Sequence, residues 1–192
     1  MIRLSHSLLE TGELILIKKI MSVRRHYDFM DRQGTKLGEA DGNIVQVSPK
    51  FRVIDNHGLE IMHLQGKAFS KQKDYTFYSP SGEEIGIMRA IFEKDELQFL
   101  VERNGEQFMF IRRELSSKPL LEELVTLPNP DEFLQGLQED YVMEIGGQTV
   151  AKVHRKWLSV RNQIELSIIG EVDHRLIIGA VIVIEHVVME GK

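Results

Sequence analysis

The sequence of 192 residues contains no cysteine. This absence excludes disulfide bonds, thiolate-ligated metal sites and a cysteine nucleophile, and it is typical of proteins from a reducing compartment. An excess of basic charge is also missing, because 24 lysines and arginines stand against 29 aspartates and glutamates, for a formal net charge of -5. General nucleic-acid binding requires a clearly basic surface. We therefore expect a cytoplasmic protein with no nucleic-acid partner.

Two further absences concern targeting and catalysis. The first six residues lack the basic start and continuous apolar stretch of a secretory signal, and Glu10 and Glu13 interrupt the next segment of the chain. The sequence contains no nucleophile elbow, phosphate-binding loop, dinucleotide fingerprint or His-Glu-x-x-His metal motif. These observations predict a protein that is not exported, is not an enzyme and needs no cofactor.

Length and composition fit one globular domain. Hydrophobic residues make up 42% of the chain and charged residues 28%, which are ordinary proportions for a chain that buries a core. This length suits one well-cored domain and is short for two, so residues 1–192 are expected to form a single domain. We interpret residues 115–131, which include Pro128 and Pro130, as a long connection between two sets of strands.

One local pattern recurs along the chain: an aromatic or aliphatic strand followed by a polar turn that contains glycine. Short turns join antiparallel strands, so five such hairpins predict about ten strands, and Asn104-Gly105 is the strongest turn signal. So many consecutive strands favour a closed barrel or a sandwich, because either limits exposed edges. The five segments are Tyr27–Gly34, Phe51–Gly58, Tyr75–Gly82, Val101–Gly105 and Tyr141–Gly147.

The most apolar run, Leu176–Ile184, is open to three interpretations. A membrane span needs about 20 mostly apolar residues, whereas this run meets Glu185 after nine. The β-branched valines and isoleucines suit a buried strand, although the run is long for one. A buried helix suits the length, with Asp173 available as its N-cap. Length and propensity favour helix and strand equally, and both are favoured over a span.

Three segments carry a resemblance to a known family. The segment Asp173–Glu185 resembles the C-terminal segment of phospholipid scramblases and LURP-one-related proteins. The segment Phe51–Ile61 resembles the second hairpin of the same family, and its late strands are resembled by Ala151–Val153 with Lys156–Ser159. The resemblance implies the tubby C-terminal-like fold, which is mainly β: a closed antiparallel β-barrel of about twelve strands around a buried hydrophobic C-terminal helix. It favours the helical interpretation, with core residues Leu176, Ile177, Ile178, Val181, Ile182 and Ile184.

Two groups of basic residues are candidates for binding anionic lipid. Each positive charge near an anionic membrane surface contributes about 1 kcal/mol. Alternation along a strand would divide neighbouring side chains between two faces, which favours an ordinary solvated strand. The first group is Lys18, Lys19, Arg24 and Arg25, and the second is Lys152, Arg155 and Lys156.

Metal binding has two weaker candidates. Glu171 and Asp173 correspond in position to the segment that scramblases are proposed to use for calcium, but they offer fewer than the six to eight oxygens that calcium takes. A helix cap is the favoured role of Asp173. His57 and His63 form a close histidine pair without an obvious third ligand.

The resemblance implies a non-catalytic binding or membrane-tethering module, which recognises an anionic lipid or a protein partner and is cytoplasmic or peripheral at a membrane. The alternative is phospholipid scrambling by a chain whose C-terminal segment is inserted in a bilayer. A small-ligand protein with a pocket in the barrel is disfavoured, because the helix that the resemblance implies would fill the interior.

Overall fold

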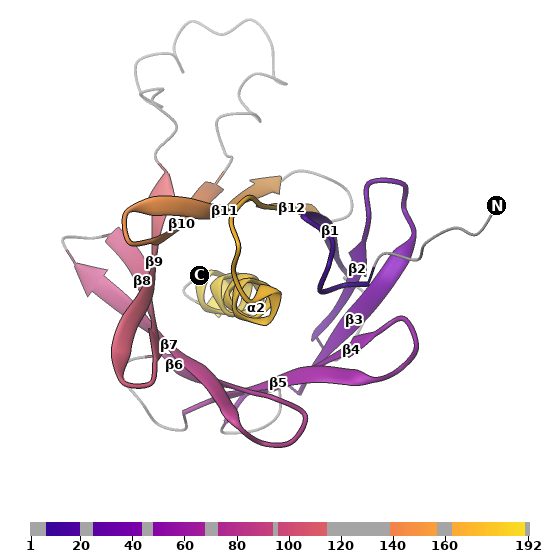
Figure 1. Ribbon diagram of the computed structural model, residues 1–192, viewed down its shortest axis with the longest axis horizontal. Helices are drawn as coiled ribbons and strands as arrows, with labels where there is room; N and C mark the ends of the chain where they lie inside the picture. Colours follow the sequence, from indigo (N-terminus) through magenta and orange to yellow (C-terminus); the bar gives the residue numbers. More distant parts are fainter. Residues whose placement is uncertain are drawn as a thin grey trace, which may run out of the picture.

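The computed structural model describes residues 7–19, 25–43, 48–67, 73–93, 96–114, 139–156 and 163–190. In this part of the chain, twelve antiparallel strands form a closed barrel around one helix (Figure 1). Three sequence predictions lie outside the described residues: the connection at 115–131, the basic residue Arg24 and the segment 157–159.

Each strand pairs with its neighbours in sequence, and β12 pairs with β1 to close the barrel. Leu16 of β1, for example, lies opposite Ile164 of β12 on one side and Phe29 of β2 on the other. The strands are β1 (Glu13–Lys18), β2 (Arg25–Met30), β3 (Lys36–Asn43), β4 (Lys50–Asp55), β5 (Glu60–Gly66), β6 (Asp74–Tyr78), β7 (Glu84–Glu93), β8 (Glu96–Arg103), β9 (Glu106–Glu114), β10 (Glu139–Ile145), β11 (Gln148–Lys156) and β12 (Gln163–Ile168).

The five predicted hairpins are all present, as the pairs β2–β3, β4–β5, β6–β7, β8–β9 and β10–β11. The turn between β8 and β9 shows why the local signal is reliable. Asn104 and Gly105 have φ angles of 54° and 79°, and a two-residue turn that matches the twist of its strands requires positive φ at both positions. The chemistry of these turns therefore specifies much of the meander.

The C-terminal apolar run forms the helix α2 (His174–Glu190), which passes through the middle of the barrel (Figure 1). The helical interpretation is confirmed, and the strand interpretation is wrong, because burial on every side outweighs the modest helix propensity of valine and isoleucine. Asp173 caps the helix: its Oδ1 accepts a hydrogen bond from the backbone N–H of Arg175 at 3.0 Å.

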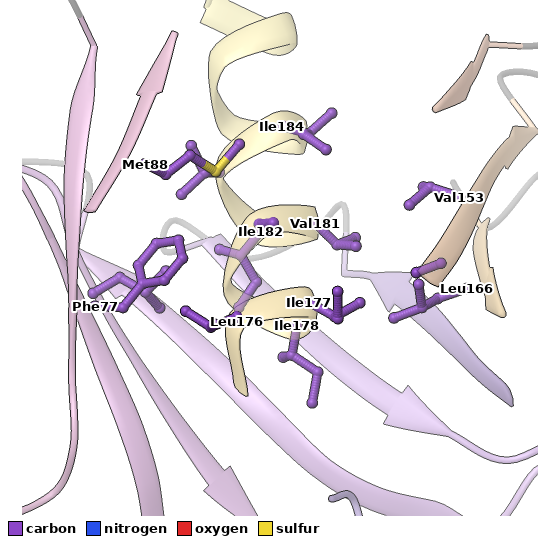
Figure 2. Packing of buried hydrophobic residues seen from close by; sticks show 14 of the residues in the cluster. Phe77, Met88, Val153, Leu166, Leu176, Ile177, Ile178, Val181, Ile182 and Ile184 are labelled. Atoms are coloured by element: carbon purple, nitrogen blue, oxygen red, sulfur yellow. The ribbon is translucent and has the colours of Figure 1, made fainter. Parts of the chain in front are cut away.

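The helix and the inner faces of the strands form one continuous core. Side chains of α2 contact residues such as Phe77, Met88 and Leu166, which point inward from the strands (Figure 2). Burying an aliphatic side chain contributes about 1.5–3 kcal/mol, so α2 is a major source of stability. Within the described residues, no helix has the length and apolar character needed to cross a bilayer. The core residues predicted on α2 are all buried: Leu176, Ile177, Ile178, Val181, Ile182 and Ile184.

Candidate functional site

Glu185, which ends the apolar run, is only 3% exposed and lies inside the barrel. Two basic residues from opposite ends of the sequence neutralise its carboxylate. Lys18 Nζ at the end of β1 lies 3.4 Å from Oε1, and Arg155 Nη2 on β11 lies 3.0 Å from Oε2. A buried charge is costly unless it is paired in this way. Lys18 and Arg155, predicted as lipid ligands, are therefore engaged inside the protein.

Aromatic and polar groups surround this ion cluster. The ring of His186 meets Phe51 and Tyr75 edge to face, with centroid distances of 5.3 Å and 5.7 Å. Tyr27 is fully buried, and burial, followed by the negative charge of Glu185, raises the pKa of its hydroxyl. The C-terminal half of α2 is therefore held by polar contacts as well as by apolar packing.

The remaining basic candidates do not form a common surface with Lys18 and Arg155. Lys19 is about half exposed, and its Nζ lies 3.0 Å from Asp28 Oδ2. Lys152 is 54% exposed, with Nζ 3.9 Å from Glu114 Oε2. Strand alternation explains the separation, because inward and outward positions follow one another along β1 and β11. Arg25 is half-buried at the start of β2, and the side chain of Lys156 lies outside the described part of the chain.

Several other exposed arginines also lie beside carboxylates. Arg52 Nε lies 2.8 Å from Glu60 Oε2, and Arg112 Nη2 lies 3.0 Å from Glu144 Oε1. Such exposed pairs contribute little to stability. They give the described surface of the barrel a mixed charge pattern in which positive and negative groups alternate.

Asp173, one of the two calcium candidates, is engaged by Arg175. Arg175 occupies both carboxylate oxygens of Asp173, with Nε 2.9 Å from Oδ1 and Nη2 2.6 Å from Oδ2. Burial acts to raise the pKa of Asp173, but the hydrogen bonds from Arg175 outweigh it and hold this pKa below its usual value. Glu171 is exposed. The arrangement agrees with the capping role predicted for Asp173.

The two histidines of the predicted pair, His57 and His63, have different contacts. His63 Nδ1 lies 2.9 Å from Glu60 Oε1, and its ring stacks on Tyr78 with a centroid distance of 5.2 Å. His57 lies in the turn between β4 and β5, where its backbone N–H donates to Asp55 Oδ1 at 2.8 Å. The structure gives neither imidazole a metal-ligating set within the described residues.

Sequence reasoning missed a polar cluster on the outer face of β2 and β3. His26 and Asp28 lie at alternate positions of β2, directly opposite Asp41 and Glu39 of β3. Their spacing, with one residue between the members of each pair, was a signal available in the sequence. It became informative only once the register of the hairpin was known.

A groove lies on the outside of the barrel, beside the turn between β10 and β11. Phe108 and Phe110 lie at outward positions of β9, since the alternate residues Met109 and Ile111 are buried in the core, and both rings are half-buried. The guanidinium of Arg103 lies 5.7 Å from the centroid of the Phe108 ring. The groove is lined by Gln107, Phe108, Phe110, Glu144, Gly146 and Gly147.

The family model for LURP-one-related proteins matches residues 43–185, well over half of the chain. The chain belongs to the LURP-one-related family. This LURP-one-related chain is also similar to a protein from Arabidopsis thaliana of known crystal structure, with a TM-score of 0.54 and 13% sequence identity over 91% of each chain. At this identity the likeness concerns the fold. No significant match was found among curated proteins.

These findings confirm the LURP-one-related part of the predicted resemblance and the barrel with its central helix. The link to scramblases and tubby-like proteins stays a prediction.

Proposed function

We propose that this LURP-one-related protein is a non-catalytic binding module that acts through the outer surface of its barrel. The observation that carries the proposal is the filled interior. The side chains of α2 from Leu176 to Ile184 occupy the space in which a ligand-binding barrel would hold a small molecule. An outer contact surface suits a macromolecular partner or a membrane surface.

The described surface favours a protein partner. The outward aromatic rings of Phe108 and Phe110 offer the kind of side chain that is enriched where proteins meet. Exposed cations such as Arg52 and Arg112 lie beside carboxylates, so the described surface alternates in charge. Alternating charge complements another protein surface better than it complements a uniformly anionic membrane.

The test is affinity purification of the full-length chain with quantitative mass spectrometry, followed by reconstitution with the purified partner. Phe110→Glu places a charge in the groove, and we expect it to reduce capture of the partner and its affinity at least tenfold. Arg52→Glu is the matched control, because β4 lies across the barrel from β9 (Figure 1). A reconstituted complex that Phe110→Glu leaves unchanged contradicts this surface.

Anionic lipid is a second candidate, favoured by the half-exposed ammonium groups of Lys19 and Lys152. Flotation with phosphatidylcholine vesicles, with and without phosphatidylserine, separates the two candidates. Salt-sensitive flotation that is lost in the double variant Lys19→Ala, Lys152→Ala would support tethering to a membrane. Absence of flotation at low ionic strength removes it. Scrambling by an inserted segment has no observation in its favour, because α2 is enclosed by the barrel.

A further inference from the structure

The outer face of β2 and β3 holds a set of polar side chains that the proposed function does not involve. Antiparallel register places Asp28 opposite Glu39 and His26 opposite Asp41, so all four lie on one patch of the sheet. Asp28 is only 5% exposed, although its neighbours Tyr27 and Phe29 fill the core side of the strand. A carboxylate buried on the outer face is unusual and requires a specific cationic partner.

We propose that this patch binds a divalent transition-metal ion through His26 Nε2, Asp28 and Glu39. Nε2 lies 3.1 Å from Asp28 Oδ1 and 3.8 Å from Glu39 Oε2. The three ligand atoms all lie within 4.8 Å of one another. Metal–ligand bonds of about 2.0–2.2 Å at tetrahedral or octahedral angles place adjacent ligand atoms about 3–3.5 Å apart, close to the two distances from His26 Nε2. Small side-chain movements therefore suffice to complete the site.

Asp41 supports this assignment, because its carboxylate contacts the other ring nitrogen of His26. Its Oδ1 lies 2.6 Å from His26 Nδ1. A carboxylate in this position accepts the Nδ1–H and favours the tautomer that carries the lone pair on Nε2, the nitrogen that would bind the metal. Lys19 Nζ lies 3.2 Å from this Nε2, so the metal would displace the ammonium group from the imidazole as well. The carboxylate–histidine pair is a common way of orienting a metal ligand, and it makes Asp41 a positioning residue.

Two lysines occupy the cation position when the metal is absent. Lys19 Nζ lies 3.0 Å from Asp28 Oδ2, and Lys36 Nζ lies 2.6 Å from Asp28 Oδ1 and also contacts Glu39. Both ammonium groups are on half-exposed side chains that can move into solvent, whereas the Asp28 carboxylate is held in place. A divalent ion replaces these monovalent charges and competes directly with them.

The ligand set indicates the class of metal. An imidazole with two carboxylates and no thiolate suits Zn²⁺, Co²⁺ or Ni²⁺ better than Ca²⁺ or Mg²⁺, which prefer oxygen ligands. Because the ligands come from both strands of one hairpin, the ion would join β2 to β3 on the outside of the barrel.

The test is a calorimetric titration of the full-length, EDTA-treated protein with Zn²⁺. We expect one ion per chain, with affinity reduced at least tenfold by His26→Gln or Glu39→Gln. Asp41→Asn should reduce it ten- to a hundredfold, as loss of an outer-shell partner does. Lys36→Met should raise the affinity, because a competing ammonium group is removed. This increase distinguishes a metal site from a simple ion-pair network, which loses a partner in the same variant.

His63→Gln is the matched control, since His63 also contacts a glutamate and should leave the affinity unchanged. NMR supplies a second readout, because Zn²⁺ should shift the Nε2 resonance of His26. Thermal melts in EDTA establish that each variant is folded, and Glu39→Gln decides the question if His26→Gln does not fold. The proposal is overturned if the wild type binds no Zn²⁺, or if binding survives His26→Gln and Glu39→Gln.

Discussion

At the scale of single residues, the most informative finding is the placement of Glu185. A carboxylate inside a barrel is tolerated because Lys18 and Arg155 reach it from β1 and β11. The sequence contains the pattern that places Lys18 inside the barrel. Leu14 and Leu16 occupy inward positions of β1, and Lys18 follows at the next alternate position. A charged residue at the end of an apolar alternation indicates a partner inside the protein as readily as a ligand outside it.

We expect Glu185→Ala to destabilise the protein by about 3–5 kcal/mol, because it removes the carboxylate from a buried ion pair with Arg155 and from its contact with Lys18. Chemical denaturation measures the change. The control is Glu144→Ala, which breaks an exposed pair with Arg112 and should cost less than about 1 kcal/mol. The triple variant Lys18→Met, Arg155→Met, Glu185→Leu should recover most of the loss. Equal effects of Glu185→Ala and Glu144→Ala would contradict the role given to the buried cluster.

At the scale of elements, hairpins and helix differ in how far the sequence predicts them. The turn at Asn104–Gly105 is specified by two adjacent residues, so local chemistry predicts it. The state of Leu176–Ile184 is decided by what surrounds it, and its composition alone is compatible with strand or helix. The register between β2 and β3, which brings His26 close to Glu39, depends on the exact turn geometry and on an irregularity between Phe29 and Met30, and this cluster was therefore missed.

Close contact between α2 and the strands gives a prediction at this scale. A Cβ at Gly179 would lie 3.0 Å from Met62 Cε and 3.2 Å from Phe77 Cε2. Gly179→Val should destabilise the protein by about 1–3 kcal/mol through overpacking. Gly179→Ala should be nearly neutral, since the flexible end of Met62 can move and alanine gains about 1 kcal/mol of helix propensity. Denaturation curves that show no difference between the two variants would refute this close approach.

At the scale of the whole molecule, the barrel and its helix form one structure with a shared core. The inward side chains of the strands contact α2, and a barrel of this width without α2 would enclose a large apolar void. The sequence predicted this architecture through the resemblance, since neither strand count nor hydrophobicity specifies what fills a barrel. The basic candidates were less predictable, because the partners of Lys18 and Lys152 depend on the packing of distant strands.

A chain that ends at Asp173 should therefore lose its native fold. Without α2 the inner faces of the strands have no apolar partner, which leaves a collapsed or aggregated chain. Loss of dispersion in the ¹H–¹⁵N correlation spectrum, with binding of a hydrophobic dye, is the expected result. The full-length chain in the same buffer is the control. A truncated chain that keeps a dispersed spectrum would show that the barrel folds without α2.

The pairing of β1 with β12 has a consequence for synthesis. Among the described elements, the strand β12 that seals the barrel and the helix α2 that fills it follow all the others in sequence, whereas β1, the partner of β12, precedes them. Eleven of the described strands are therefore synthesised before β12 and α2 can close the barrel and cover their apolar faces. Because the core is complete only when α2 is present, we expect a chain that lacks α2 during synthesis to be prone to self-association.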